Sequence, residues 1–480
     1  MTQQMLNFVS IETQRPKKRP AARRRRDFTE IYHGFDTDAA AEQASRCSQC
    51  GIPFCQVHCP LSNNIPDWLQ LTAEGRVEEA YELSSATNNL PEICGRICPH
   101  DRLCEGNCVI EQSGHGTVTI GSVETFITET AWANGWVLPP APVHERSESV
   151  GIIGAGPAGL AAAEQLRHKG YRVFVYDRYD RVGGLLIYGI PSFKLEKHLV
   201  ERRADLLRRG KVEFVLDFEI GRDSTFAELR ARHDVLLVAS GTYQARNIPV
   251  PGVGLGGVVE ALDYLIASNR KSLDDYVLDD DLDANYKNVV VVGGGDTAMD
   301  CVRTAVRQGA ASVKCLYRRD RDNMPGSQRE VAHAEEEGVE FVWLSAPQAF
   351  LGDDNTNKVC SVRTQRMHLG SPDATGRQVP EPIEGSNYVI DADLVIKAFG
   401  FDPEDLPTLW GEPTLPVSSW GTLRVDHRTM MTDMDGVFAA GDIVRGASLV
   451  VWAIRDGRDA AAGIHQHLTE QSAKNAVAAE

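Results

Sequence analysis

Cysteine is distributed so unevenly along this chain that its placement limits the possible folds more than any other feature. Eight of the eleven cysteines in the 480 residues lie in two short groups, CSQCGIPFCQVHC (47–59) and CGRICPHDRLCEGNC (94–108). The N-terminal stretch lacks the charged-then-apolar order of a secretion signal, and no apolar run is long enough to span a membrane. The sequence therefore predicts a cytoplasmic protein, whose reduced thiols bind a metal or cluster rather than form disulfides.

The first cysteine group has the spacing of a ligand set for an iron–sulfur cube. Its first three cysteines can occupy three corners, and its last is followed by Pro60. In bacterial ferredoxins the cysteine before a proline goes to the other cluster. By that logic the sequence favours two 4Fe-4S clusters, one held by Cys47, Cys50, Cys55 and Cys108 and the other by Cys59, Cys94, Cys98 and Cys104.

A glycine-rich loop follows the cysteine region. Gly154, Gly156 and Gly159 form G-x-G-x-x-G between a predicted strand and a predicted helix. Such a loop lets the backbone approach a pyrophosphate, which the helix N-terminus then faces. Asp177 ends the next strand, where an acid that binds ribose is expected. We therefore predict a dinucleotide site here, with Gly184 among its cofactor-binding residues.

A second loop of the same kind, G-x-G-x-x-A, follows a run of four valines about 140 residues later. Gly293, Gly295 and Asp296 belong to this loop. Arg318 and Arg319 stand where the first site has its acid, and guanidinium groups bind a 2′-phosphate that a carboxylate would repel. The second site is therefore predicted to take NADP(H) rather than NAD(H). The alternative is that the two arginines are merely solvated at a strand end.

The C-terminal stretch TDMDGVFAAGD indicates which nucleotide the first loop binds. It resembles the second FAD motif of flavoproteins that have two dinucleotide-binding domains. The resemblance implies that Asp442, next to Gly441, holds the ribityl chain of FAD. Residues 234–242 and 393–401 resemble the stretches through which such chains cross into and out of the NADPH domain. An NADPH domain inserted in the FAD domain is therefore expected.

The whole chain is thus expected to have an α/β fold with an N-terminal helical iron–sulfur domain and two Rossmann-like dinucleotide-binding domains. Within the helical part, Pro66 suits a first helical turn and Gly75 separates two short helices. The predicted bounds are 1–145 for the iron–sulfur domain with its basic arm, 146–249 and 401–480 for the two parts of the FAD domain, and 250–400 for the NADPH domain.

Three alternatives bear on the cysteine sites. Cys98 also precedes a proline, so the sequence does not fix the partition, and Glu124 is an alternative to Cys94 in the second set. Two zinc sites would use the same eight thiolates. Clusters are favoured, because the chain has no C-x-x-C after Cys50 to take electrons from the flavin, and a flavin can pass them singly to a cluster. The remaining three, Cys301, Cys315 and Cys360, are expected to be buried small hydrophobic residues.

Taken together, the motifs CSQCGIPFCQVHCPLSNNIP, ICGRICPHDRLCEGNC, GLLIYGIPSFKL, GGGDTAMDCVRTAVRQGA and TDMDGVFAAGD resemble the small (beta) subunits of NADPH-dependent glutamate synthase. The resemblance implies FAD, NADPH, two 4Fe-4S clusters and a hetero-oligomer with a large (alpha) subunit that makes glutamate from glutamine and 2-oxoglutarate. One alternative is a paralogous flavoprotein with another partner, for ferredoxin, sulfide or pyrimidine reduction. Another is a zinc-stapled binding protein. Hydride transfer needs no acid or base, so no catalytic residue is assigned.

One segment opposes the acidic character of the chain. The net charge of -17 argues against general nucleic-acid binding, yet RPKKRPAARRRR (15–26) has eight basic residues in twelve. This arm is either a solvated, partly disordered segment or a docking arm for an acidic partner surface, with RNA a weaker alternative. Its role is not decided by the sequence.

Overall fold

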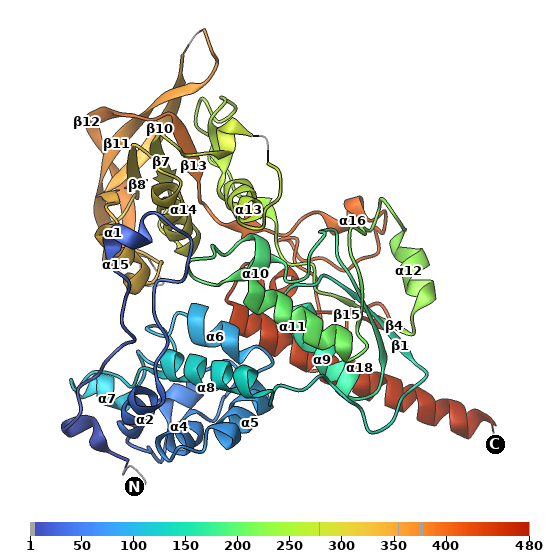
Figure 1. Cartoon of the computed structure of the whole chain (residues 1–480). Coiled ribbons are helices and arrows are strands. Elements are labelled where there is room, and N and C mark those ends of the chain that lie inside the picture. Colours follow the sequence, from blue (N-terminus) through green and yellow to red (C-terminus); the bar gives the residue numbers. More distant parts are fainter. Residues whose placement is uncertain (1–4, 278, 354, 374–375, 377, 480) are drawn as a thin grey trace.

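The computed structural model describes residues 5–277, 279–353, 355–373, 376 and 378–479, and it has three parts (Figure 1). A helical N-terminal part packs against two parts that are each built on a parallel sheet. Searched over these described residues, the structure has no helix that is both long enough and apolar enough to cross a membrane.

The N-terminal part is a compact group of short helices around the cysteines. α4 and α5 confirm the two helices expected on either side of Gly75, which has φ +78°. Trp68, Val123 and Ile127 are buried here and pack in one core with five of the cysteines. The helices are α2 (Thr37–Ser45), α3 (Phe54–Val57), α4 (Ile65–Ala73), α5 (Val77–Thr87), α6 (Pro91–Ile97), α7 (Val109–Gln112) and α8 (Ile120–Asn134), and the 3-10 turn η1 (Asn7–Val9) precedes them. The short helix α1 (Ala21–Arg24) lies apart from this group.

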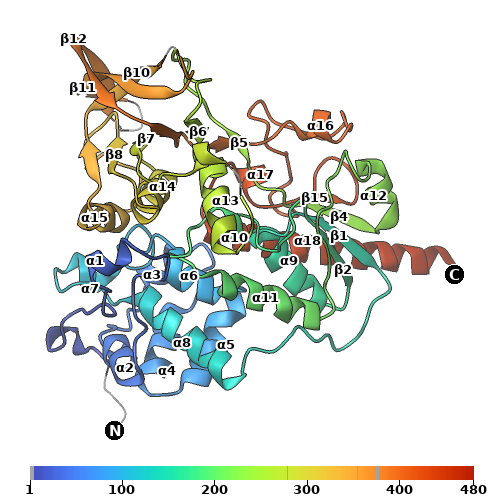
Figure 2. The same cartoon turned by 45° about the horizontal axis from the view of Figure 1, so that its top comes forward.

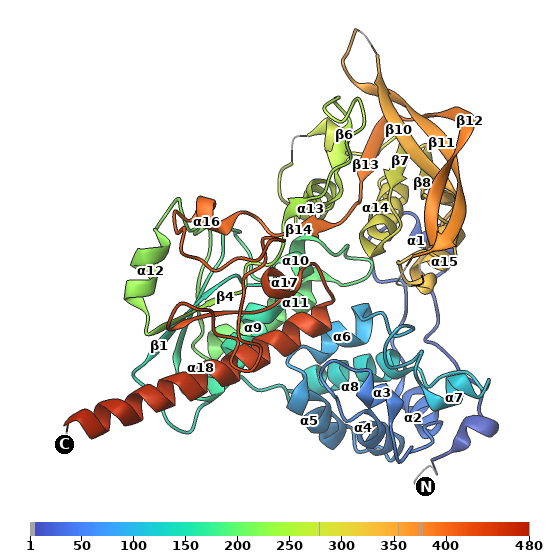
Figure 3. The ribbon, with the colours of Figure 1, turned by 180° about the vertical axis from the view of Figure 1, so that it is seen from behind.

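The first sheet has five parallel strands in the order β15-β4-β1-β2-β3. Apolar side chains project from both faces of this sheet, and helices cover both faces, as is typical of parallel sheets. The strands are β1 (Ser149–Ile153), β2 (Arg172–Tyr176), β3 (Glu213–Val215), β4 (Val235–Val238) and β15 (Val437–Ala439). One face is covered by α9 (Pro157–His168), α11 (Lys197–Arg209) and the long α18 (Val450–Ala479), which Figure 3 shows in red, and the other by α12 (Phe226–Arg232), α16 (Leu406–Leu409) and α17 (Asp442–Arg445).

The second sheet repeats this plan in the order β6-β13-β7-β8-β9. The valines of β7 alternate between the two apolar cores, which confirms a strand buried on both faces. The strands are β6 (Val258–Glu260), β7 (Asn288–Val292), β8 (Ser312–Leu316), β9 (Glu340–Val342) and β13 (Leu394–Lys397). Helices α13 (Ala261–Ser272), α14 (Asp296–Arg307) and α15 (Gln328–Glu336) cover one face, and the short 3-10 turn η2 (Asp280–Leu282) follows α13.

The other face of the second sheet is covered by an antiparallel sheet that the sequence analysis did not anticipate. It consists of β10 (Ser345–Gly352), β11 (Val359–Pro372) and β12 (Gln378–Asp391). Phe350 and Val362 are buried between the two sheets. Many residues of β12 are exposed, because only one face of this sheet packs on the protein.

The second sheet is inserted between strands of the first. β4 and β15 are neighbours in the first sheet although the whole second sheet lies between them in sequence. The chain leaves through β5 (Gln244–Ala245) and returns through β14 (Phe401–Asp402), and these two short strands pair with each other. This topology confirms the expected insertion, whereas the residue bounds of the domains remain predictions.

The basic arm is not the solvated, partly disordered segment that was considered. Arg24 is only 1% exposed, and its guanidinium lies 2.6 Å from the carboxylate of Glu336. Lys18 also binds Glu336. Figures 1 and 2 both show α1, at the centre of the arm, lying beside α15 of the second sheet. The arm therefore folds back onto an acidic helix of its own chain, which local sequence could not reveal.

Candidate cofactor sites

The first glycine loop connects β1 to α9 in the way a pyrophosphate site requires. Gly154 has φ +115°, and a Cβ there would lie 2.2 Å from the Ala239 carbonyl oxygen. A Cβ on Gly159 would lie 2.0 Å from the Gly154 oxygen. Gly156 differs, because a Cβ there would meet no atom within 4 Å, and it caps the N-terminus of α9. The open space in front of Gly156 fits a phosphate group.

A cavity of about 240 Å³ gathers most of the residues predicted for the first site. It is lined by Gly154, Gly156, Asp177, Gly184, Gly441 and Asp442, among others. Gly159 is not part of this lining, because it packs under the loop. A second cavity of about 270 Å³ shares Gly154, Asp177, Ser240 and Tyr243 with the first. Two adjoining cavities on either side of one loop suit an elongated dinucleotide such as FAD.

Two buried carboxyl groups face this space. Asp177 accepts hydrogen bonds from the backbone N–H of Ala155 (2.7 Å) and of Tyr179 (2.9 Å), which fix its orientation. Burial raises the pKa of Asp177, and burial raises the pKa of Asp442 to about 6. Carboxylates in these positions can accept hydrogen bonds from the hydroxyl groups of a ribose and a ribityl chain.

The second glycine loop has the same geometry. Gly293 has φ +149°, and a Cβ there would lie 2.3 Å from the Ala398 oxygen, whereas a Cβ on Gly295 would meet no atom within 4 Å. Gly295 is the N-cap of α14, so the N-terminus of α14 faces the open space in front of Gly295. Asp296 accepts a hydrogen bond from the Ser327 N–H (2.9 Å) and forms an ion pair with Arg102 (3.0 Å). The loop therefore fits a second pyrophosphate.

The two arginines after β8 lie in different surroundings. Arg318 is exposed, whereas Arg319 is 6% exposed and its Nε donates to the Gln378 oxygen (2.9 Å). One side chain thus reaches solvent near the loop, and the other ties β8 to β12. The two arginines could not be distinguished from the sequence, because it does not reveal their tertiary contacts.

The cavity of about 240 Å³ at the first glycine loop, which we call the flavin cavity, is also lined by residues that the sequence analysis did not single out. Leu262 and Leu265 of α13 and Thr297 and Asp300 of α14 line it. These helices belong to the second sheet, so both nucleotide-binding parts contribute to one space. The position of Asp300 one turn into α14 could have suggested a role, but only the fold shows that it faces the first site.

The eight clustered cysteines gather at two places. Cys47, Cys50, Cys55 and Cys108 line one small cavity, and Cys59, Cys94, Cys98 and Cys104 line another. This is the grouping favoured from the spacing, although the ligand assignments themselves remain predictions. Burial raises the pKa of Cys47 to about 11, and burial holds the pKa of Cys104 well above its usual range. Such thiols stay protonated unless a positive centre stabilises their thiolates, so both sets suit metal binding.

Glu124 and Cys94 both border the second cysteine cavity. Glu124 already accepts hydrogen bonds from Asn88 (3.2 Å) and Ser84 (3.5 Å). Burial raises the pKa of Glu124 to about 8, which favours its neutral form. Because these two hydrogen bonds already hold the Glu124 carboxyl, the geometry favours Cys94.

The two cysteine groups differ in how they pack against the part built on the first sheet, which we call the flavin part. Cys59, Cys94 and Cys98 pack in one apolar cluster with residues of α10 (Leu185–Tyr188) and α18. α10 also lines the flavin cavity. The other group belongs to the separate helical core. The second cysteine group is therefore the one that adjoins the flavin site.

Comparisons with known proteins agree with this arrangement. Residues 24–136 match the family model described as dihydropyrimidine dehydrogenase domain II, 4Fe-4S cluster, and residues 148–457 match pyridine nucleotide-disulphide oxidoreductase. The fold is shared with FprA of Mycobacterium tuberculosis, at TM-score 0.58 and 18% identity, over 69% of this chain and 86% of that one.

Two curated relatives extend over almost the whole chain. The glutamate synthase (NADPH) small chain of Azospirillum brasilense is 67% identical over 482 residues, covering 100% of this chain and 99% of that protein. The protein of the same name from Escherichia coli K12 is 44% identical over 469 residues, covering 97% and 99%. With two dinucleotide loops, two cysteine sites and full-length identity of this degree, the chain belongs to the family of small chains of NADPH-dependent glutamate synthase, an oxidoreductase family.

Proposed function

We propose that this chain is the electron-input subunit of glutamate synthase. It would oxidise NADPH and deliver electrons to a large subunit that forms L-glutamate from L-glutamine and 2-oxoglutarate. The observation that carries the proposal is the position of the flavin cavity, which borders the NADPH-type loop through α14 and the second cysteine group through α10. Family membership supports the same role.

The bound groups would supply the electron chemistry, because NADPH gives a hydride, FAD accepts electron pairs and releases single electrons, and an iron–sulfur cluster accepts them one at a time. The chain's own residues would bind and orient these groups. The N-termini of α9 and α14 would face the two pyrophosphates, and Asp177 and Asp442 would accept hydrogen bonds from hydroxyl groups of the bound FAD. The eight cysteines would hold the two clusters.

The first cysteine group is the one that a partner can approach. Ile52, Phe54 and Val57, which lie among its cysteines, are 67%, 46% and 62% exposed. Apolar side chains with this exposure are typical of a contact surface. We place the large subunit against this surface, on the side of the protein away from the flavin cavity.

The isolated chain should reduce an artificial dye with NADPH. It has a donor site and a flavin site of its own, so dye reduction needs no partner. The measurement is the anaerobic rate of dye reduction at equal concentrations of NADPH and NADH, in protein with a full complement of FAD. NADPH should be much the better donor. Failure of NADPH to reduce the dye in such protein would contradict the electron-input role.

Replacing Arg318 and Arg319 together by alanine should weaken NADPH binding far more than NADH binding. Charge-assisted hydrogen bonds to the 2′-phosphate contribute roughly 1.5–3 kcal/mol each. Because Arg319 is buried against β12, we expect Arg318→Ala alone to account for most of this loss and to leave the melting temperature nearly unchanged. The apparent KM for each nucleotide tests this. Equal losses for NADPH and NADH would show that the arginines have another role.

A further inference from the structure

The basic arm and the residues that follow it form a hairpin, residues 15–33, which we call the strap. Backbone hydrogen bonds join Arg19 N–H to the Ile31 oxygen (2.8 Å) and His33 N–H to the Lys17 oxygen (2.9 Å). α1 forms the tip of this hairpin. We infer that the strap holds the part built on the second sheet, which we call the NADPH-binding part, in the orientation that hydride transfer to the flavin requires. This inference rests on the proposed oxidation of NADPH.

The base of the strap is anchored on the helical N-terminal part that holds the eight cysteines, which we call the cysteine domain. Arg15 forms an ion pair with Glu105 (2.9 Å), which is 2% exposed. On the other arm of the hairpin, Glu30 forms one with Arg96 of α6 (2.8 Å). Glu105 follows Cys104 directly in the chain, and Arg96 lies between Cys94 and Cys98. The strap therefore starts from the framework that holds the second cysteine group.

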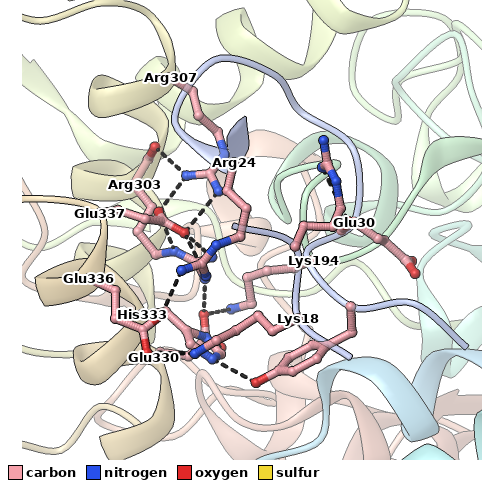
Figure 4. Close-up of polar contacts among 12 residues, drawn as sticks. Lys18, Arg24, Glu30, Lys194, Arg303, Arg307, Glu330, His333, Glu336 and Glu337 are labelled. Carbon is pink, nitrogen blue, oxygen red and sulfur yellow. Dashed lines mark hydrogen bonds and ion pairs between the residues drawn. The ribbon is translucent and has the colours of Figure 1, made fainter. Parts of the chain in front are cut away.

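The tip of the strap grips α15 of the NADPH-binding part. Arg24 lies 2.6 Å from Glu336 and 3.3 Å from Glu337, and Lys18 lies 2.5 Å from Glu336. Tyr32 forms a hydrogen bond with His333 (2.8 Å). Figure 4 shows Lys18 and Arg24 of the strap close to His333, Glu336 and Glu337 at α15. Because Arg24 is buried and shared between two carboxylates, the contact is specific rather than a loose surface attraction.

The carboxylates that the strap contacts are part of a longer network through α14. Glu337 binds Arg303 (3.0 Å) and Arg307 (2.6 Å), and Glu330 binds Arg303 (2.6 Å). One turn before Arg303, Asp300 lines the flavin cavity and pairs with Lys194 of the flavin part (2.8 Å). The charged face of α14 therefore extends from the strap to the flavin cavity.

An aromatic contact joins the same three parts. Phe28 of the strap lies 6.3 Å, between ring centroids, from Phe193 of the flavin part, which is fully buried. The guanidinium carbon of Arg307 lies 3.9 Å from the centre of the Phe193 ring. Strap, flavin part and NADPH-binding part thus meet at one point. A second contact, Arg102 to Asp296, also links the cysteine domain to α14, but both side chains are about 40% exposed.

The consequence for function follows from how domains move. Parts joined by a few chain crossings change their relative orientation unless an interface holds them. The strap adds such an interface on the side away from β5 and β14. Without it, a smaller fraction of molecules would have α14 at the flavin, and the rate of hydride transfer would fall in proportion. Nucleotide binding to the second glycine loop itself would not change, because among the described residues no hydrogen bond or ion pair joins the strap to that loop.

The test uses the full chain with both Lys18 and Arg24 replaced by alanine, and the double variant R23A/R26A as a matched control. Arg23 and Arg26 carry the same charge in the same hairpin tip but are exposed. In anaerobic stopped-flow experiments, K18A/R24A should lower the limiting rate of flavin reduction by about tenfold, with the NADPH concentration at half-maximal rate changed less than about twofold. R23A/R26A should match the wild type. FAD and iron contents are measured for each protein.

Hydrogen exchange of the same proteins completes the test. In the wild type, the Arg19 and His33 amides should be protected, and in K18A/R24A exchange should rise in the strap and in α15. An unchanged limiting rate in a variant whose strap has been released would overturn the inference, as would unprotected strap amides in the wild type. The wild-type measurement applies even if the variant does not fold. Because NADPH would still reduce the wild-type flavin, these outcomes leave the proposed function standing.

Discussion

Gly156→Leu should give a folded protein that contains almost no FAD. The backbone at Gly156 is extended, with φ -76° and ψ -177°, which any residue adopts, and a Cβ there meets no protein atom within 4 Å. The side chain would instead occupy the space of the pyrophosphate, so FAD affinity should fall by more than about a hundredfold. Flavin absorbance per protein measures this, and circular dichroism checks the fold.

Gly295→Leu is the matched control, because that position has the same backbone conformation and the same open space in the second loop. It should keep FAD and lose reduction by NADPH, while dithionite still bleaches its flavin. The assignment of the two loops would be wrong if Gly295→Leu lost FAD and Gly156→Leu retained it.

Cys50→Ser should remove one of two clusters. About half of the iron and acid-labile sulfide should be lost, since each four-iron cube needs its own ligand set. The N-terminal domain should also unfold more easily, because cluster binding is coupled to its folding. Cys360→Ser is the control, since Cys360 lies far from both groups in sequence and is exposed on β11. The expectation of a buried side chain was therefore wrong for Cys360, although it is confirmed for Cys301 and Cys315. Anaerobic purification followed by iron, sulfide and zinc analysis gives the measurement.

The same assay distinguishes the two candidates for the fourth ligand of the second cluster. Cys94→Ser should lower the iron content, whereas Glu124→Gln should retain it, because the amide can still accept a hydrogen bond from Asn88. Loss of iron in Glu124→Gln alone would favour the carboxylate. Stoichiometric zinc without iron in the wild type would contradict the cluster assignment as a whole.

The features that the sequence predicted correctly have local causes. A phosphate-binding loop needs its glycines at fixed positions between a strand and a helix, and β1–α9 and β7–α14 have that order. The alternation of buried valines in β7 follows from a strand with two covered faces. The two cavities that the cysteines line match the grouping favoured from the spacing and Pro60, whereas the ligand assignments remain predictions.

The features that the sequence did not predict depend on contacts between distant residues. Arg24 reads as one of several solvated arginines, yet it is buried against Glu336, which lies about three hundred residues away. Arg319 resembles Arg318 until β12 is placed beside it. Asp300 lines the flavin cavity only because the second sheet is inserted into the first fold. Neither periodicity nor motif spacing contains information about such pairings.

The most direct test of the electron-input role is NADPH-driven glutamate formation with separately purified chains. This chain, a glutamate synthase large subunit, glutamine, 2-oxoglutarate and NADPH are combined, and each chain is also assayed alone. Glutamate should form from NADPH only when both chains are present, and Gly295→Leu should abolish it. Glutamate formation by this chain alone, or by the large subunit with NADPH in its absence, would contradict the account.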